Sequence, residues 1–132
     1  MVKKYLKKII ARSPQDLHMI SACCFEAKVK LSEIKYLKKN KIFLLFLERL
    51  NQEQTNKSKK INSIVKFEFI DSSKSKNIDQ KDKDKVLKLL AIDLIKKQEN
   101  YEIVLLFSNN AIITLLAEII EVTLEDQNEK ND

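Results

Sequence analysis

The sequence contains no glycine, no tryptophan, one proline, two cysteines and one histidine among its 132 residues. The lack of glycine excludes the Walker and Rossmann phosphate-binding loops, because both need glycine where the backbone approaches a phosphate closely. The cysteines, Cys23 and Cys24, are adjacent and cannot form an ordinary disulfide framework, which favours a reducing compartment.

Long hydrophobic runs are also lacking, since no apolar stretch approaches the roughly 18 residues of a membrane span. Residues 1–10 have the lysines of a signal peptide but too short an apolar region, and no small-residue cleavage site follows them. We therefore expect a cytoplasmic protein without a membrane partner.

The net charge is +6 at pH 7, and nearly all cations are lysines, with Arg12 and Arg49 the only arginines. The abundant residues (Lys, Ile, Asn) have AT-rich codons, so genome composition is the simplest explanation of the positive charge. Binding to nucleic acid or to an acidic partner is the alternative.

A chain of 132 residues has the length of one domain and can bury about two-thirds of its unfolded surface. Hydrophobic residues at 44% and charged residues at 33% are typical of a globular protein. We predict a single domain over residues 1–126, followed by a polar tail at 127–132.

The clearest helix signal begins at Ser13, which can cap free backbone N–H groups. Pro14 suits the first helical position, and Asp16 completes a capping box. We predict a helix over residues 14–27 that packs on a sheet, with its apolar face formed by Leu17, Ile20, Cys24 and Ala27.

Period-two alternation and short apolar runs predict strands elsewhere. The run at 42–50 is apolar on both faces, which indicates a central strand covered on one side by the helix. Residues 71–85 are polar and are predicted to form a loop. The predicted strands are 2–11, 28–38, 42–50, 63–70 (Ser63, Val65, Phe67 and Phe69 on one face), 86–95 (Leu90, Ile92 and Leu94 on one face), 101–107 and 111–124.

The densest apolar sequence, residues 101–126, gives the strongest hairpin signal, with a turn at residues 108–110. We expect this hairpin to form the centre of the sheet. Residues 111–125 fit two structures: a strand with a β-bulge near 117–120, or a helix with its glutamates on one side. The predicted fold is α+β, a mainly antiparallel sheet of about six or seven strands with one N-terminal helix.

The order of motifs resembles a bacterial, mainly alphaproteobacterial, family known as domain of unknown function 2948. The matching residues, spread over nearly the whole chain, are Asp16-Leu17, Ile20-Ser21-Ala22, Glu48-Arg49, Leu89-Leu90-Ala91-Ile92, Phe107-Ser108, Glu118, Ile120-Glu121, Leu124 and Asp126. The chain departs from the family pattern where Asn109-Asn110 replace a glycine-rich turn, where an arginine is replaced near Ile113, and where tryptophans are absent. The resemblance supports a hairpin but implies no activity.

The titratable residues offer no recognisable catalytic set. His18 is the only histidine and has no nucleophile placed beside it by the sequence. Cys23 and Cys24 lack the spacing of a metal or redox pair, and Cys24 lies on the predicted buried face. We assign no catalytic residue, no cofactor and no metal ligand.

A polar cluster at one margin of the sheet is the sharper hypothesis for a site. Glu118, Glu121 and Asp126 could meet Glu48 and Arg49, and paired carboxylates can serve acid–base chemistry or hold a divalent ion. A solvated strand edge with structural ion pairs is the simpler interpretation.

Lysines concentrate in the predicted loops and would make a basic face if those loops share one side of the sheet. No aromatic residues interleave with them, so base stacking is not indicated. The candidate contacts for RNA or another polyanion are Lys57, Lys59, Lys60, Lys81, Lys83 and Lys85.

The sequence leaves three functions open. The first is a non-enzymatic binding or protein-interaction module, favoured by a substantial core without a catalytic set. The second is a polyanion-binding protein that uses its lysine loops. The third is an enzyme or metal binder that uses the carboxylates near Glu118 and Glu121.

Overall fold

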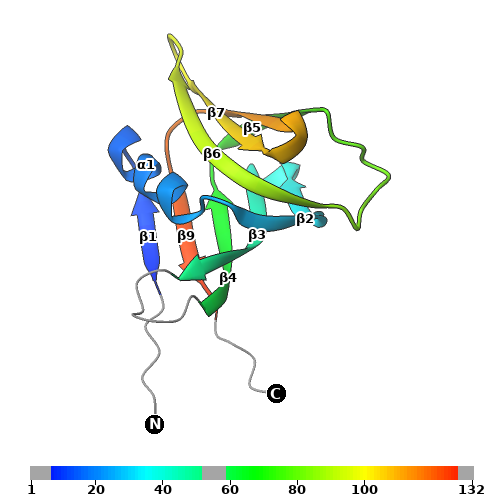
Figure 1. The fold of residues 1–132 in the computed structure, drawn as a ribbon. Helices are drawn as coiled ribbons and strands as arrows, with labels where there is room; N and C mark the ends of the chain where they lie inside the picture. Colours follow the sequence, from blue (N-terminus) through cyan, green and yellow to red (C-terminus); the bar gives the residue numbers. More distant parts are fainter. Residues whose placement is uncertain (1–6, 52–58, 128–132) are drawn as a thin grey trace.

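A computed structural model describes residues 7–51 and 59–127 (Figure 1). They form nine strands in one sheet, in which every neighbouring pair is antiparallel. The helical segments are α1 (Pro14–Cys23), η1 (Lys38–Asn40) and η2 (Ser108–Asn110). The strands are β1 (Lys8–Ala11), β2 (Ala27–Leu37), β3 (Ile42–Asn51), β4 (Lys59–Phe67), β5 (Ile70–Lys76), β6 (Val86–Lys96), β7 (Tyr101–Phe107), β8 (Ile112–Ala117) and β9 (Val122–Asp126).

The strand order is β1-β9-β4-β3-β2-β6-β7-β8-β5, so β2 lies at the middle of the sheet. The register of β2 against β3 shifts between Val29 and Ile34, which marks a bulge where the sheet bends. Figure 1 shows β1, β9, β4 and β3 in one half and β6, β7 and β5 in the other. Both halves contribute to a single hydrophobic core, as Val65 and Leu124 of one half and Leu105 and Leu115 of the other are buried.

The predicted helix start is confirmed. The Ser13 hydroxyl accepts a hydrogen bond of 3.2 Å from the Asp16 N–H, and Pro14 occupies the first turn. Leu17 and Ile20 are buried, as expected. The helix ends at Cys23, four residues before the predicted end, because the chain enters β2 at Ala27.

Helix α1 packs mainly against β1 and β6 rather than against β3, which we had expected it to cover. Strand β6 pairs with β2 only through Val86–Leu89. Beyond that point the Ile92 N–H donates to the Ser21 hydroxyl of α1 at 2.9 Å. Helix α1 therefore contacts β6 beyond the point where the pairing of β6 with β2 stops. Within the described residues, no helix combines the length and the apolar character needed to cross a membrane.

The α+β fold is confirmed, with more strands than the six or seven predicted. The predicted loop at 71–85 contains most of β5, whose sequence IDSSKSK is too polar to be recognised as a strand because it lies at an edge with little buried surface. The predicted long last strand divides into β8 and β9. Residues 118–121 are neither a bulge within one strand nor a helix, but the passage between two distant places in the sheet.

The hairpin of β7 and β8 is confirmed, with its turn at the predicted residues. Asn109 and Asn110 take positive φ values of 61° and 59°, which asparagine tolerates better than most residues. The prediction that this hairpin forms the centre of the sheet is wrong, since only β5 lies beyond β8 on that side. Two residues do not share the face predicted for them: Phe69 is 41% exposed in a turn, unlike Val65 and Phe67, and Leu90 is 40% exposed where the register of β6 shifts, unlike Ile92.

Candidate functional site

The predicted carboxylates are each held by a different cation. Glu118 accepts a hydrogen bond from the Lys41 ammonium at 2.7 Å, and the same ammonium lies 3.0 Å from Asp71. The hydrogen bonds that the Lys41 ammonium donates to Glu118 and Asp71 raise the pKa of Lys41. This exposed triad ties the turn after η1 to β5 and to the end of β8.

Glu121 binds Arg12 through two contacts, 2.9 Å to the guanidinium Nε and 3.4 Å to Nη2. The hydrogen bond from Arg12 holds the pKa of Glu121 below its usual value and raises that of Arg12. Glu48 lies 3.8 Å from the Lys60 ammonium. Within residues 7–51 and 59–127, no three His, Cys, Asp or Glu side chains gather in a way that could hold a metal ion.

The lysines proposed for polyanion binding lie in two separate places. Lys59 and Lys60 begin β4, whereas Lys81, Lys83 and Lys85 lie in the long connection from β5 to β6. Figure 1 shows the start of β4 at the bottom of the fold and this connection at the right. Lys57 lies outside the described residues. This placement gives little support to one continuous basic face.

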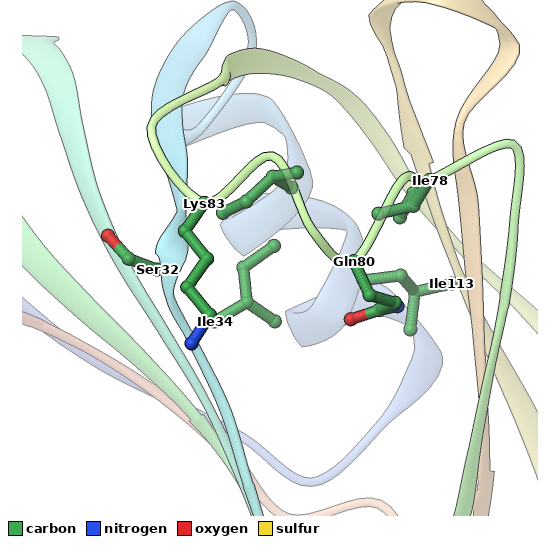
Figure 2. A pocket seen from close by; sticks show the side chains of 7 residues that line it. Ser32, Ile34, Ile78, Gln80, Lys83 and Ile113 are labelled. Atoms are coloured by element: carbon green, nitrogen blue, oxygen red, sulfur yellow. The ribbon is translucent and has the colours of Figure 1, made fainter.

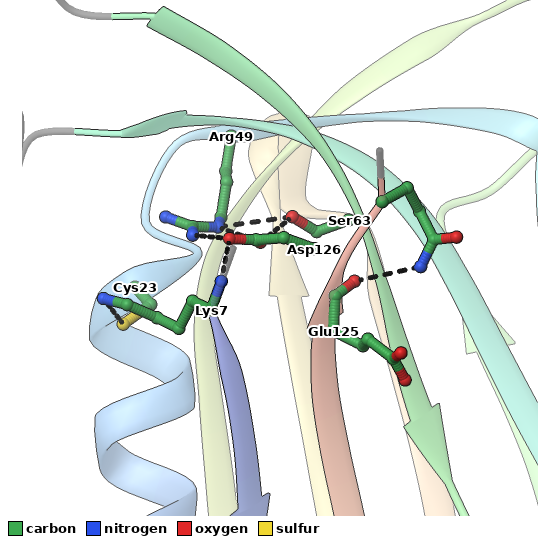
Figure 3. A network of polar contacts seen from close by, with 7 residues as sticks. Lys7, Cys23, Arg49, Ser63, Glu125 and Asp126 are labelled. Atoms are coloured by element: carbon green, nitrogen blue, oxygen red, sulfur yellow. Dashed lines mark hydrogen bonds and ion pairs between the residues drawn. The ribbon is translucent and has the colours of Figure 1, made fainter. Parts of the chain in front are cut away.

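Of the predicted polar cluster, Arg49 and Asp126 do meet, in a buried network with Ser63 and Lys7 that the sequence did not predict (Figure 3). Arg49 donates to Asp126 through Nη2 at 2.7 Å and through Nε at 3.1 Å. The Ser63 hydroxyl donates to Asp126 at 2.6 Å, and the backbone N–H of Lys7 does so at 2.8 Å. The network therefore joins β3, β4 and β9 to the residue that precedes β1.

The alternation of buried residues in the sequence indicates the positions of this network, although the side chains at these positions are charged. Arg49 continues the inward alternation of Leu45 and Leu47, and Asp126 continues that of Val122 and Leu124. Burial alone would raise the pKa of Asp126, but the hydrogen bonds from Arg49, Ser63 and Lys7 outweigh it and hold the pKa below its usual range. Every buried side-chain polar atom of the described residues has a partner.

The cysteines lie beside this network. Cys24 is fully buried, and burial raises the pKa of its thiol to about 12. Cys23 is partly exposed, and the Lys7 ammonium lies 3.8 Å from its sulfur (Figure 3). His18 is exposed on α1. The polar network and Cys24 are thus parts of the core. Satisfied hydrogen bonds in a low-dielectric interior stabilise the fold, and a buried thiol with a raised pKa is unreactive.

A pocket of about 370 Å³ lies between β2, β8 and the connection from β5 to β6 (Figure 2). Its lining residues come from all three: Leu31, Ser32, Ile34, Ile78, Gln80, Lys83 and Ile113. None of these residues was singled out as a pocket from the sequence, because the bulge of β2 and the path of the connection bring them together.

Backbone hydrogen bonds hold the connection over the pocket. The N–H groups of Leu31 and Ser32 donate to the carbonyls of Lys85 at 2.9 Å and Lys83 at 3.0 Å. At the other end, the Asn77 amide donates to the Asn110 carbonyl at 2.8 Å. The wall of the pocket is therefore attached to both β2 and the β7–β8 turn.

The pocket combines an aliphatic interior with a polar rim. Leu31, Ile34, Ile78 and Ile113 supply apolar surface, and Ser32, Gln80 and Lys83 supply hydrogen-bonding groups. The Lys83 ammonium has no ion pair with any described residue, whereas the neighbouring Asp84 lies 3.7 Å from Lys30. Such a pocket suits a molecule with an apolar body and an anionic or hydrogen-bond-accepting head.

Comparisons with curated proteins and with solved structures found no match. A family model described as "Protein of unknown function (DUF2948)" matches residues 7–132, which include every element of the fold from β1 to β9. The chain therefore belongs to the DUF2948 family, as the order of its motifs indicates.

Proposed function

We propose that this chain is a bacterial cytoplasmic binding protein whose pocket takes small amphipathic anions, such as medium-chain carboxylates, without transforming them. The observation that carries the proposal is the pairing of aliphatic walls with one unpaired ammonium, that of Lys83, at the rim. The adjacent free thiols of Cys23 and Cys24 support a reducing compartment.

The volume supports a small ligand. About 370 Å³ lies within the range of roughly 300–1,000 Å³ that is typical of small-molecule sites. Burying an alkyl chain against Leu31, Ile34 and Ile113 contributes about 0.8 kcal/mol for each CH₂ group, which makes affinity rise with chain length until the pocket is full.

The rim supports a preference for anions. Lys83 can donate a charge-assisted hydrogen bond, and the amide of Gln80 and the hydroxyl of Ser32 can donate neutral ones. Because Lys83 is exposed, its charge contributes to selectivity and association more than to tight binding. Micromolar or weaker affinity is expected.

Amide NMR spectra of the protein titrated with octanoate, and separately with octylammonium, test this function. Octanoate should shift the amides of Leu31, Ser32 and Ile113 at lower concentration than the cation of equal length. Equal binding of both probes, or shifts that avoid these residues, would contradict an anion-selective pocket.

Two matched variants locate the head group. Lys83→Gln should weaken octanoate binding by about threefold to tenfold, the size of one exposed charge-assisted contact. Lys85→Gln removes the same charge from the same connection but from a residue that does not line the pocket, and should leave affinity unchanged. A larger loss in Lys85→Gln than in Lys83→Gln would place the head group elsewhere.

A further inference from the structure

The outer face of β6, β7, β8 and β5 carries an apolar patch that no described element covers. Its members alternate with the core residues of the same strands. The patch consists of Ile95, Val104, Leu106, Ile112, Thr114 and Leu116, all outside the hydrophobic core cluster. Ile95 is 47% exposed.

The sequence of this hairpin is that of strands buried on both sides. Residues 103–107 and 112–117 are almost continuously apolar, a pattern typical of strands with both faces covered. Their inner residues, among them Leu105 and Leu115, face the core, while the outer ones are half-buried. The outer positions of β7 and β8 are polar only at Thr114 and at Glu102, which pairs with Lys97 at the margin of the patch, whereas a solvated face would carry polar residues throughout.

The strand register places opposite charges at the two ends of this patch. Asp93 of β6 pairs with Val104, Val104 pairs with Thr114, and Thr114 pairs with Lys74 of β5. Asp93 and Lys74 therefore end one row of outward side chains with two uncharged residues between them. Neither has an ion pair with any described residue.

This row is complementary to itself. A twofold axis that runs parallel to the strands, between β7 and β8, places β6 of one copy over β5 of the other. Asp93 of each copy then faces Lys74 of its partner, and Val104 faces Thr114, in an aligned packing of two sheets about 10 Å apart. An axis perpendicular to the strands would place Asp93 over Asp93 instead.

We infer that this chain forms a reversible homodimer through the outer face of β6, β7, β8 and β5, with Asp93 and Lys74 paired across the interface. Four strands spaced about 4.8 Å apart and about seven residues long present roughly 450 Å² of sheet per copy. The total of about 900 Å² is below the size of a standard stable interface, so the dimer dissociates at micromolar concentration.

Sedimentation velocity over a dilution series, at low salt, tests the dimer. The mass should rise from monomer toward dimer as concentration increases from about 5 to about 500 µM, the range in which a small interface associates. Amide shifts that change on dilution should concentrate on Val104, Leu106 and Thr114. A monomer throughout this range overturns the inference.

Charge exchange tests the geometry. Lys74→Asp and Asp93→Lys should each weaken dimerisation about fivefold or more, because each places like charges together twice. The double variant should restore wild-type association. Lys76→Asp is the control, since it makes the same change on β5 in the next row, which ends at the uncharged Ala91 and not at Asp93. Failure of the double variant to recover, in a folded protein, overturns the proposed arrangement.

Discussion

Arg49 and Asp126 lie 77 positions apart in the sequence and meet inside the fold through two hydrogen bonds of 2.7 and 3.1 Å. Their side chains are 4% and 0% exposed. A buried charge is tolerated only when its partner and its remaining hydrogen bonds are present, and here Ser63 and the Lys7 N–H complete the set. The pair therefore fixes how β3 and β9 sit on either side of β4.

Removal of one member should destabilise the fold strongly. Arg49→Met leaves the Asp126 carboxylate buried without its cation, which should lower the free energy of unfolding by about 3–5 kcal/mol. Arg49→Met combined with Asp126→Leu removes both charges and should cost much less. Urea unfolding followed by circular dichroism measures both variants.

The other arginine provides the matched control. Arg12 is 69% exposed in its pair with Glu121, so Arg12→Met should leave the free energy of unfolding nearly unchanged. If the single Arg49 variant were no less stable than the double variant, the ion pair would not be the reason for the loss.

The contribution of the Asp126 carboxylate to the free energy of unfolding should disappear in acid. Its pKa in the folded protein lies below the unfolded value of about 3.9, so the stabilisation is fully present above that value. It is lost as pH falls through the folded pKa, because the unfolded chain binds the proton first. Wild-type protein should therefore lose its advantage over Asp126→Asn as pH falls from about 6 to about 2.

The measurement is the difference in unfolding free energy between wild type and Asp126→Asn at several pH values. Glu125→Gln reports the effect of removing a neighbouring carboxylate that points outward from β9. A difference between wild type and Asp126→Asn that stayed constant with pH would show that the loss in the asparagine variant comes from geometry and not from charge.

Local chemistry was readable in the sequence where it depends on neighbours in the chain. The Ser13 cap, the Asn109-Asn110 turn and the β7–β8 hairpin need only nearby residues and alternation, and all were predicted. The polar edge strand β5 was missed because an edge strand buries little and its pairing partner β8 lies far along the chain.

The candidate sites were beyond sequence reasoning for a related reason. The pocket exists because a bulge turns β2 and places Ile34 near Ile113, nearly 80 positions away, which no local pattern encodes. Glu118 and Glu121 are close in sequence, yet along the passage between β8 and β9 Glu118 pairs with Lys41 and Glu121 pairs with Arg12.

The two adjacent thiols should differ sharply in reactivity. Cys24 is fully buried with a pKa of about 12, whereas Cys23 is partly exposed. Iodoacetamide added to native protein should modify Cys23 alone, and both thiols should react in urea. Mass spectrometry of digests identifies the modified residue, and Cys23→Ser should remove the native reaction. Modification of Cys24 at the rate of Cys23 would mean that the core opens readily at α1.

The same raised pKa predicts a loss of stability in alkali. Because the folded state keeps the Cys24 proton, its contribution is complete below the unfolded thiol pKa of about 8.5 and is lost as pH rises toward 12. Cys24→Ala should show a flatter decline of unfolding free energy over that interval. An identical decline in both proteins would assign the alkaline loss to other groups.

The lack of glycine leaves strain that a single substitution should relieve. Glu26 has a φ of 64° in the turn between α1 and β2, and its side chain is exposed. A residue with a Cβ atom in the left-handed region destabilises the fold by about 1–2 kcal/mol. Glycine avoids this strain but loses more chain entropy on folding, which offsets about 0.5–1 kcal/mol of the gain. Glu26→Gly should therefore stabilise the protein by about 0.5–1 kcal/mol in thermal or urea unfolding. Glu33→Gly, on the exposed side of β2 without positive φ, should destabilise it. Equal destabilisation by both changes would mean that the turn at Glu26 carries no strain.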